Sequence, residues 1–317
     1  MKDFLKNYIY FYKIPFIPKV YRKIFFKEYA YNTHENRDEN KIYYVIRVNP
    51  IKKIGVFAYY RYVLGHILYC INNNYIPVVN MRDYKNVYID WPNNSMVNSW
   101  ETFFEQPAGI DLDYVMHCKN VIFSKPDDNE DGLLYNDYTA PRKYVKAIAN
   151  KYIRFNDVVN KMIEEEYERV LKGKGRICGL KLRGSDYIIS KFHKHAIIPE
   201  KQKEYDDIID TLNSWGEKYD YIYLSTEDKS LIEYFTDRLG EKIIYRNINR
   251  YDADKIWYKS KKGYEERVQE GYDYCIDVGL LSKCDALITT VCQGAGAAVI
   301  INDDKYENIK VLDYGFY

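Results

Sequence analysis

Several common classes of protein leave patterns that this sequence lacks. Its six cysteines are scattered, and no two form the CxxC pair of a zinc or dithiol redox site. Neither a GxSxG nucleophile elbow nor an HExxH helix occurs, so two large hydrolase classes are not indicated. Acidic and basic residues nearly cancel, to a formal net charge of +1, so the protein has no overall positive potential that would attract nucleic acid. Any phosphate site must be local, and the cysteines are expected to be core residues in a reducing compartment.

An apolar run long enough to span a bilayer is also missing from the N-terminal segment. Residues 1–29 mix aromatic side chains with basic ones and contain no small-residue cleavage site. Two interpretations stay open: a segment that lies on a membrane surface, or a helical cover packed on the first domain. The sequence therefore predicts a cytoplasmic protein, either free or peripheral on the inner face of the membrane.

The length favours two domains, because 317 residues exceed the size at which single cores usually stop growing. After an N-terminal segment 1–40, a βαβ unit is predicted from a strand at 42–48, a helix at 59–72 and a strand at 75–80. Residues 91–109 mix loop chemistry with large rings, and 141–173 are predicted to form one long amphipathic helix. These signals place the first α/β domain at 41–172.

The second domain, 173–317, alternates strands and helices more clearly. Strands are predicted at 177–182, 221–225, 242–245 and 286–289, and helices at 200–215, 229–239, 272–282 and 295–301. This alternation predicts a parallel, doubly wound sheet. Such sheets bind ligands beyond the carboxyl ends of their strands, so polar loops at those ends are the candidate site.

The first such loop follows the strand that opens the second domain. Arg183 offers a planar fork of donors suited to a diphosphate, Gly184 lets the backbone approach closely, and Ser185 adds a hydroxyl. The alternative is an ion pair between Arg183 and Asp186 that only pins the loop. We interpret residues 183–186 as donor-binding, with Arg183 also acting in catalysis.

The second loop, Ser225-Thr226-Glu227-Asp228, follows the next predicted strand. Ser225 or Thr226 is expected to be the N-cap of the following helix, with the two acidic residues in its first turn. Capping alone explains this pattern. The functional alternative is that Ser225, Thr226 and Asp228 contact the nucleotide.

The third loop, residues 289–298, contains Gln293-Gly294-Ala295-Gly296 and joins a strand to a helix. Small residues at such a turn expose backbone amides at the positive end of the helix, where phosphate binds well. The alternative is that glycine and alanine only permit close packing of the helix. As the third polar turn of one sheet, it is predicted to contact the donor.

These segments resemble the fucosyltransferase-like glycosyltransferases of the GT-B architecture, which include bacterial enzymes of capsule and O-antigen synthesis. The likeness is carried by residues 181–186, by His195 with Pro199, by 223–228, by 293–298, by 55–80 and by 98–107. It implies two Rossmann-like, doubly wound domains that face a cleft. It also implies that the donor is held by Arg183 to Asp186, His195, the second and third loops, and Gly55 in the first domain.

The chemistry that the resemblance implies is inverting transfer of fucose or a similar sugar from a nucleotide donor, GDP-linked, without a metal or other cofactor. The sequence shows no DxD motif after a buried strand of the second domain; Asp111 and Asp113 have that spacing but belong to the first. Arg183 and helix-end amides would then offset the charge of the departing diphosphate. The acceptor would be a glycan or a lipid-linked glycan.

Candidates for the base that activates the acceptor lie in the first domain: Glu101, Glu105, Asp90 and His66. Trp100 and His66 are predicted to contact the acceptor. Each has a structural alternative, since His66 falls within an apolar helical stretch and Glu101 could anchor a loop. Two other functions also stay open: a non-catalytic nucleotide-sugar or glycan-binding protein, and a partner-binding role for the aromatic N-terminus.

Overall fold

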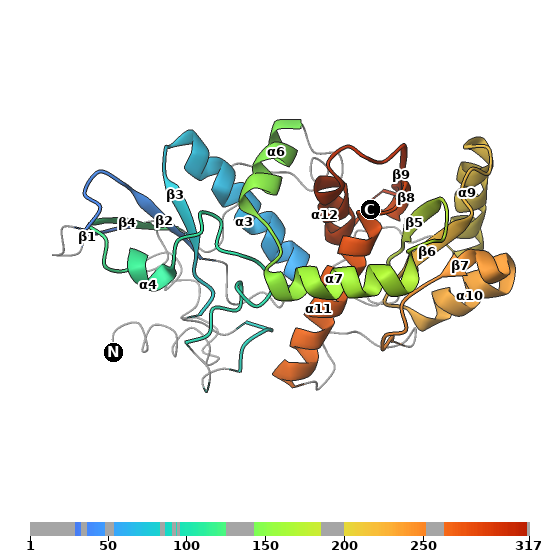
Figure 1. Cartoon of the computed structure of the whole chain (residues 1–317), viewed down its shortest axis with the longest axis horizontal. Helices are drawn as coiled ribbons and strands as arrows, with labels where there is room; N and C mark the ends of the chain where they lie inside the picture. The colour runs from blue at the N-terminus through green and yellow to red at the C-terminus, as the bar shows by residue number, and fades with distance from the viewer. Residues whose placement is uncertain are drawn as a thin grey trace. The chain divides into compact units, whose positions relative to one another are not determined.

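The computed structural model describes residues 29–32, 37–47, 54–82, 86–90, 93, 96–124, 143–184, 200–251 and 263–315 (Figure 1). The chain divides into two compact units. The first comprises Met1–Tyr135, Arg142–Val159 and Gly263–Tyr272, and the second Asn136–Pro141, Asn160–Lys262 and Asp273–Tyr317. Within the described ranges, no helix has both the length and the apolar composition needed to cross a bilayer. The basic, aromatic segment up to residue 28 lies outside these ranges.

The first unit contains a four-stranded sheet with the order β1-β4-β2-β3. Its strands are β1 (Tyr29–Asn32), β2 (Tyr43–Ile46), β3 (Ile76–Val79) and β4 (Asn120–Phe123). Strands β4, β2 and β3 are parallel, and β1 is antiparallel to β4. Helix α3 (Val56–Asn72) connects β2 to β3, so the predicted βαβ unit is confirmed.

The core of the first unit lies on both faces of β2, which is why this strand is apolar without interruption. Tyr43 and Val45 pack on one face with residues of β3, β4 and the short helix α4 (Leu112–Val115). Tyr44 points the other way, and its ring centroid lies 5.4 Å from that of Tyr69 on α3. The period-two alternation of a strand thus divides the aromatic residues between two layers.

The second unit is built on a five-stranded, fully parallel sheet with the order β7-β6-β5-β8-β9. Its strands are β5 (Ile177–Lys181), β6 (Tyr221–Ser225), β7 (Ile243–Ile244), β8 (Ala286–Thr290) and β9 (Asn308–Leu312). The chain runs outward from β5 to β7, then returns to β8 on the other side of β5. This is the predicted doubly wound topology, with its switch point between β5 and β8.

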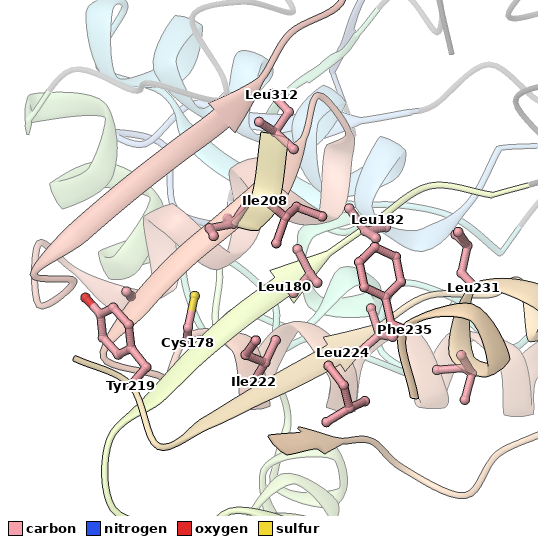
Figure 2. Packing of buried hydrophobic residues seen from close by; sticks show 14 residues of the cluster. Cys178, Leu180, Leu182, Ile208, Tyr219, Ile222, Leu224, Leu231, Phe235 and Leu312 are labelled. Carbon is pink, nitrogen blue, oxygen red and sulfur yellow. The ribbon is translucent and has the colours of Figure 1, made fainter. Parts of the chain in front are cut away.

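Alternation along the central strands separates an apolar face from a polar one. Ile222 and Leu224 of β6 pack with Phe235 in a buried cluster that also contains Leu180 and Ile208 (Figure 2). The cluster places α9 (Lys201–Ser214) and α10 (Lys229–Leu239) on this face. The opposite face of the sheet meets α11 (Tyr264–Leu281), and its polar side chains form the network described below.

The helical stretch expected over 141–173 is instead two helices, α6 (Lys143–Tyr152) and α7 (Asp157–Val170). The break is set by Asn156, whose side chain accepts a hydrogen bond from the amide of Val159 at 2.9 Å, as an N-cap does. The same side chain donates to the carbonyls of Glu101 and Thr102. Apolar spacing continues through the break, so the pattern alone predicted one helix.

Other elements differ from the prediction in extent. Helix α11 begins at Tyr264, two turns before the predicted start at 272, and β7 is only two residues long. Strands β1, β4 and β9 and helix α4 were not predicted. Helix α12 (Gln293–Asn302) and the turn η2 (Gly240–Lys242) complete the described elements of the second unit.

Candidate functional site

The loops after β5 and β8 meet at the switch point of the second unit's sheet. The amide of Arg183 donates a hydrogen bond to the hydroxyl of Thr290 at 3.3 Å. One residue earlier on β8, the hydroxyl of Thr289 donates to the carbonyl of Lys181 at 3.1 Å. The structure therefore brings together the first and third of the loops that the sequence singled out, at the position where parallel sheets bind ligands.

The loop after β6 meets the same point through Glu227. Its carboxylate accepts a hydrogen bond from the amide of Gly184 at 3.0 Å and lies 3.6 Å from the Nε atom of Arg183. The other carboxylate oxygen lies 3.6 Å from the Nζ atom of Lys181. We call Lys181, Arg183 and Glu227 the cationic cluster, because two positive charges surround one negative charge.

Lys181 is the buried member of the cationic cluster. It is 2% exposed, donates to the carbonyl of Ser225 at 3.5 Å, and places its Nζ atom 5.2 Å from the ring centroid of Tyr274 on α11. A buried ammonium group needs such partners, since desolvation disfavours the charged form. Lys181 and Glu227 were not predicted as site residues, although Lys181 is the last residue of β5 and Glu227 lies in the loop after β6.

Gly184 is required by its contact with Asp228. A Cβ atom added at position 184 would lie 2.3 Å from the Cβ and 2.8 Å from a carboxylate oxygen of Asp228. No side chain larger than hydrogen fits unless one of the two loops moves. The glycine therefore lets the first and second loops pack together, which is a structural reason for its presence at this position.

The helix after the second loop has the predicted bounds, 229–239, but a different N-cap from the predicted one. Asp228, not Ser225 or Thr226, is the N-cap of α10, and its carboxylate accepts hydrogen bonds from the amide and the hydroxyl of Ser230 at 2.8 and 2.6 Å. The hydroxyl of Thr226 accepts from the amide of Asp228 at 3.2 Å. Both side chains, which were predicted to contact the nucleotide, thus shape the loop itself.

Ser225 points away from the loop, toward α11. Its hydroxyl donates to Asp277 at 2.9 Å, and the hydroxyl of Tyr223 donates to the other oxygen of the same carboxylate, also at 2.9 Å. Burial, and then the Asp277 charge, raise the pKa of Tyr223 well above its usual value. Ser225 is therefore part of a buried polar network behind the sheet edge.

Arg246 completes this network. The guanidinium is 4% exposed and donates to the carboxylates of Glu166, Asp273 and Asp277 at 2.9, 3.0 and 3.1 Å. The three carboxylates come from α7 and α11, and the hydroxyls of Tyr223 and Ser225 connect them to β6 behind the candidate site. Local sequence patterns do not reveal this network, because Arg246 and Glu166 are 80 positions apart.

The third loop uses its small residues for packing. The amide of Gly294 donates to the hydroxyl of Tyr274 at 3.1 Å, and a Cβ atom at this position would lie 2.3 Å from that oxygen. Ala295 and Gly296 are buried in α12. Gln293, at the first position of the helix, has its side-chain oxygen buried without a hydrogen-bond partner among the described residues. An orphaned acceptor beside the switch point is a sign of a ligand that donates.

Three predicted donor residues, Ser185, Asp186 and His195, lie outside the described residues, and so does the alternative ion pair of Asp186. Gly55, the predicted donor residue of the first unit, is the N-cap of α3. The amide that follows it, on Val56, donates to the hydroxyl of Tyr88 at 2.9 Å.

The two glutamates of the first unit differ in their partners. The exposed Glu101 accepts hydrogen bonds from the side-chain amides of Asn98, at 2.9 Å, and Gln106. Glu105 forms an ion pair with both Nε and Nη2 of Arg154, at 2.8 and 2.7 Å. Asn98 and Gln106 also bond the backbone of Val79, so Glu101 lies at the carboxyl end of β3.

Trp100 and His66, the predicted acceptor residues, are both 1% exposed. The indole N–H donates to the carbonyl of Glu105, and the ring stacks on Phe104 with centroids 4.4 Å apart. Burial, and then the charge of Arg47, lower the pKa of His66 to about 3, so its imidazole stays neutral. In this structure both side chains are core residues, and their rings offer no face to an acceptor.

Two further candidate carboxylates of the first unit have local partners. Asp90 accepts a hydrogen bond from the side chain of Asn93 at 3.1 Å. Of the DxD-like pair, Asp111 caps α4 and Asp113 forms an ion pair with Arg82. Among the described residues, no group of three or more His, Cys, Asp or Glu side chains is arranged as metal ligands would be.

Comparison with known proteins gives a match at the level of structure. No family model matches the chain, and no curated protein matches it by sequence. NodZ alpha-1,6-fucosyltransferase soaked with GDP-fucose matches with a TM-score of 0.52 and 13% identity, over 82% of this chain and 93% of that one. The structure of NodZ co-crystallised with GDP (TM-score 0.50, 12% identity) matches over 82% of this chain and 92% of its own. For fucosyltransferase NodZ from Bradyrhizobium (TM-score 0.50, 12% identity), the shares are 82% and 93%.

At these identities the likeness concerns the fold. It covers most of both chains, and it agrees with the two units and their parallel sheets. The protein therefore has the predicted α/β, GT-B-like fold, with Rossmann-like parallel sheets.

Proposed function

We propose that this protein is a glycosyltransferase of the fucosyltransferase type. It transfers fucose or a similar sugar from a nucleoside-diphosphate donor, GDP-linked, to a glycan or lipid-linked glycan in bacterial surface-polysaccharide synthesis. The second unit binds the donor and the first unit the acceptor. The solved structures of similar fold, which were obtained with GDP-fucose or GDP, support a donor of this class.

The cationic cluster is the observation that carries the proposal. Arg183 follows the central strand β5 and lies at the switch point, with its amide bonded to Thr290 across that point. Glu227, 3.6 Å from its Nε atom, holds the guanidinium in a fixed environment. A guanidinium of this kind binds a diphosphate with directional, charge-assisted hydrogen bonds. Gln293 adds an acceptor in the neighbouring loop.

In the proposed reaction, Arg183 stabilises the negative charge that develops on the departing nucleoside diphosphate. No metal or other cofactor is required, since the arginine and the amides at the start of α12 supply the positive potential. The acceptor hydroxyl attacks the anomeric carbon with inversion while a base removes its proton. We assign the base to Glu101 before Glu105, because the Glu105 carboxylate is already paired with Arg154.

The proposal is tested by nucleotide binding. Isothermal titration with GDP, UDP, dTDP and CMP is expected to show a preference for GDP. Arg183→Ala should weaken GDP binding by about 10- to 150-fold, since a hydrogen bond to a charged group contributes about 1.5–3 kcal/mol. Arg238→Ala, at an exposed arginine of α10, should leave the affinity unchanged.

Transfer of radiolabelled sugar from GDP-fucose to a glycan acceptor separates an enzyme from a binding protein. Product formation in the presence of EDTA, lost in Arg183→Ala, is the expected result. Donor binding without turnover on any acceptor would indicate the non-catalytic alternative. Normal GDP affinity in Arg183→Ala would refute the role of the cationic cluster, and preference for a UDP-sugar would change the donor.

A further inference from the structure

Glu204 is a buried carboxyl group close to the cationic cluster. It lies in the first turn of α9 and is 5% exposed. Its side chain makes no hydrogen bond or ion pair with any residue that the structure describes. Most of this side chain is removed from water and no described residue compensates a charge on it, so the neutral form is favoured.

The first turn of α9 packs against the start of α10. Lys201 donates to the hydroxyl of Ser230 at 2.7 Å, and Gln202 accepts from the hydroxyl of Tyr234 at 2.9 Å. This places Glu204 beside the loop that ends in the N-cap Asp228. Glu227 in that loop contacts Arg183, and Asp228 contacts Gly184. A charge on Glu204 therefore acts on Glu227 and Asp228, the two acids of this loop.

The charged and titratable groups around Glu204 come from three elements. They are Lys201, Lys203 and Asp207 on α9, Glu227 and Asp228 on the loop after β6, and Tyr314 near the C-terminus. Lys203 is paired with Asp207 at 2.8 Å. Burial, and then Asp207, Asp228 and Glu227, raise the pKa of Glu204 to about 7.

We propose that Glu204 controls the anion affinity of the cationic cluster through its own ionisation. Lys181 and Arg183 balance Glu227 and Asp228 while Glu204 is protonated. Ionised Glu204 leaves this group of side chains with a net negative charge beside the bound diphosphate. The proposal rests on the anion site of the proposed function, and it adds a residue that senses pH to that site.

The direction of the pH dependence follows from the negative charge that Glu204 gains when it ionises. As pH rises from 6 to 8, Glu204 loses its proton and the affinity for an anion falls, by about tenfold for one added charge at an effective dielectric constant of about 20. By linkage, binding of the anion near pH 7 takes up a proton, because the bound anion favours neutral Glu204.

The experiment measures GDP-fucose binding by isothermal titration at pH 6, 7 and 8, in two buffers of different ionisation enthalpy. The diphosphate diester of GDP-fucose does not titrate in this range, so proton uptake comes from the protein. Wild type is expected to lose about tenfold in affinity and to take up a fraction of a proton near pH 7. In Glu204→Gln the affinity should be independent of pH and proton uptake should vanish. Asp210→Asn, an exposed acid of the same helix, should behave as wild type.

Sulfate, which stays doubly charged across this range, is the second probe and is titrated at constant ionic strength. If GDP-fucose fails to bind but sulfate binds with a pH dependence that Glu204→Gln removes, the donor assignment falls and the role of Glu204 stands. If Glu204→Gln is folded and keeps the pH dependence and proton uptake of wild type, the proposal is wrong. It is equally wrong if wild type binds either anion with the same affinity at all three pH values, or binds neither.

Discussion

The contact between Gly184 and Asp228 makes a sharp prediction about the candidate site. A methyl group at position 184 would lie 2.3 Å from the Asp228 Cβ atom and 3.0 Å from its Cγ atom. The first distance is far below van der Waals contact, and both atoms belong to a residue fixed as the N-cap of α10. Gly184→Ala must therefore move one of the two loops.

The expected cost is about 2 kcal/mol. Overpacking in a well-packed region typically costs 1–3 kcal/mol, and loss of an N-cap costs about 0.5–2 kcal/mol. The structure is expected to relieve the clash by whichever of these two changes, overpacking or loss of the N-cap, costs less free energy. For a unit of this size, about 2 kcal/mol lowers the melting temperature by about 4–8 °C. GDP affinity should fall as well, because the amide of Gly184 bonds Glu227, which contacts Arg183.

The assay is urea unfolding of Gly184→Ala followed by tyrosine fluorescence, with the free energy of unfolding compared with that of wild type. Asp228→Gly serves as the matched background, because it removes the Cβ atom that the new methyl group meets and costs only a few tenths of a kcal/mol as an N-cap. In a double-mutant cycle, Gly184→Ala should cost about 1–2 kcal/mol less in this background than in wild type. A cost below about 0.5 kcal/mol in wild type, or the same cost in both backgrounds, would refute the reasoning.

Two further predictions concern buried charges. Asp277→Asn should destabilise the protein by about 2–4 kcal/mol in urea unfolding, because Arg246 then loses one of its three carboxylate partners; the exposed Asp210→Asn should change it by less than about 0.5 kcal/mol, and equal effects would contradict the network. Burial and the neighbouring acids raise the pKa of Glu204 from about 4.5 in the unfolded chain to about 7 in the folded protein, so the stability that goes with its protonated form is fully present below about pH 4.5 and is lost as pH rises through 7. The free energy of unfolding of Glu204→Gln should therefore gain about 3 kcal/mol relative to wild type between pH 4.5 and 8, and parallel pH profiles would show that the carboxyl group is not buried as described.

The second unit could largely be predicted from the sequence. Its strands are short apolar runs separated by helical patterns, and Arg183 follows the first of them, so its place at the sheet edge follows from topology alone. The first unit was less predictable. Strands β1 and β4 pair residues about 90 positions apart in sequence, which local pattern does not reveal.

The candidate site was predictable in position and less so in the role of each side chain. Ser225 and Thr226 carry hydroxyl groups of the kind that contact ligands. In the structure the Ser225 hydroxyl instead bonds Asp277, and the Thr226 hydroxyl bonds the amide of Asp228. Trp100 and His66 show the same limit, because a large ring serves a core and a binding surface equally well and sequence does not record burial. Glu227 does not stand out in the sequence, because an acid near the start of a helix is already explained by the helix dipole.

The buried guanidinium of Arg246 also bears on how the second unit could be studied in isolation. A fragment that begins at residue 173 would omit Glu166, one of the three carboxylates around that cation, and Ile163, whose side chain packs against Gly279. Truncation at that point would expose α11 around Gly279 and leave the positive charge of Arg246 with one carboxylate fewer. A fragment that keeps α7 retains both contacts, so recombinant expression of the C-terminal half is best begun before Asp157.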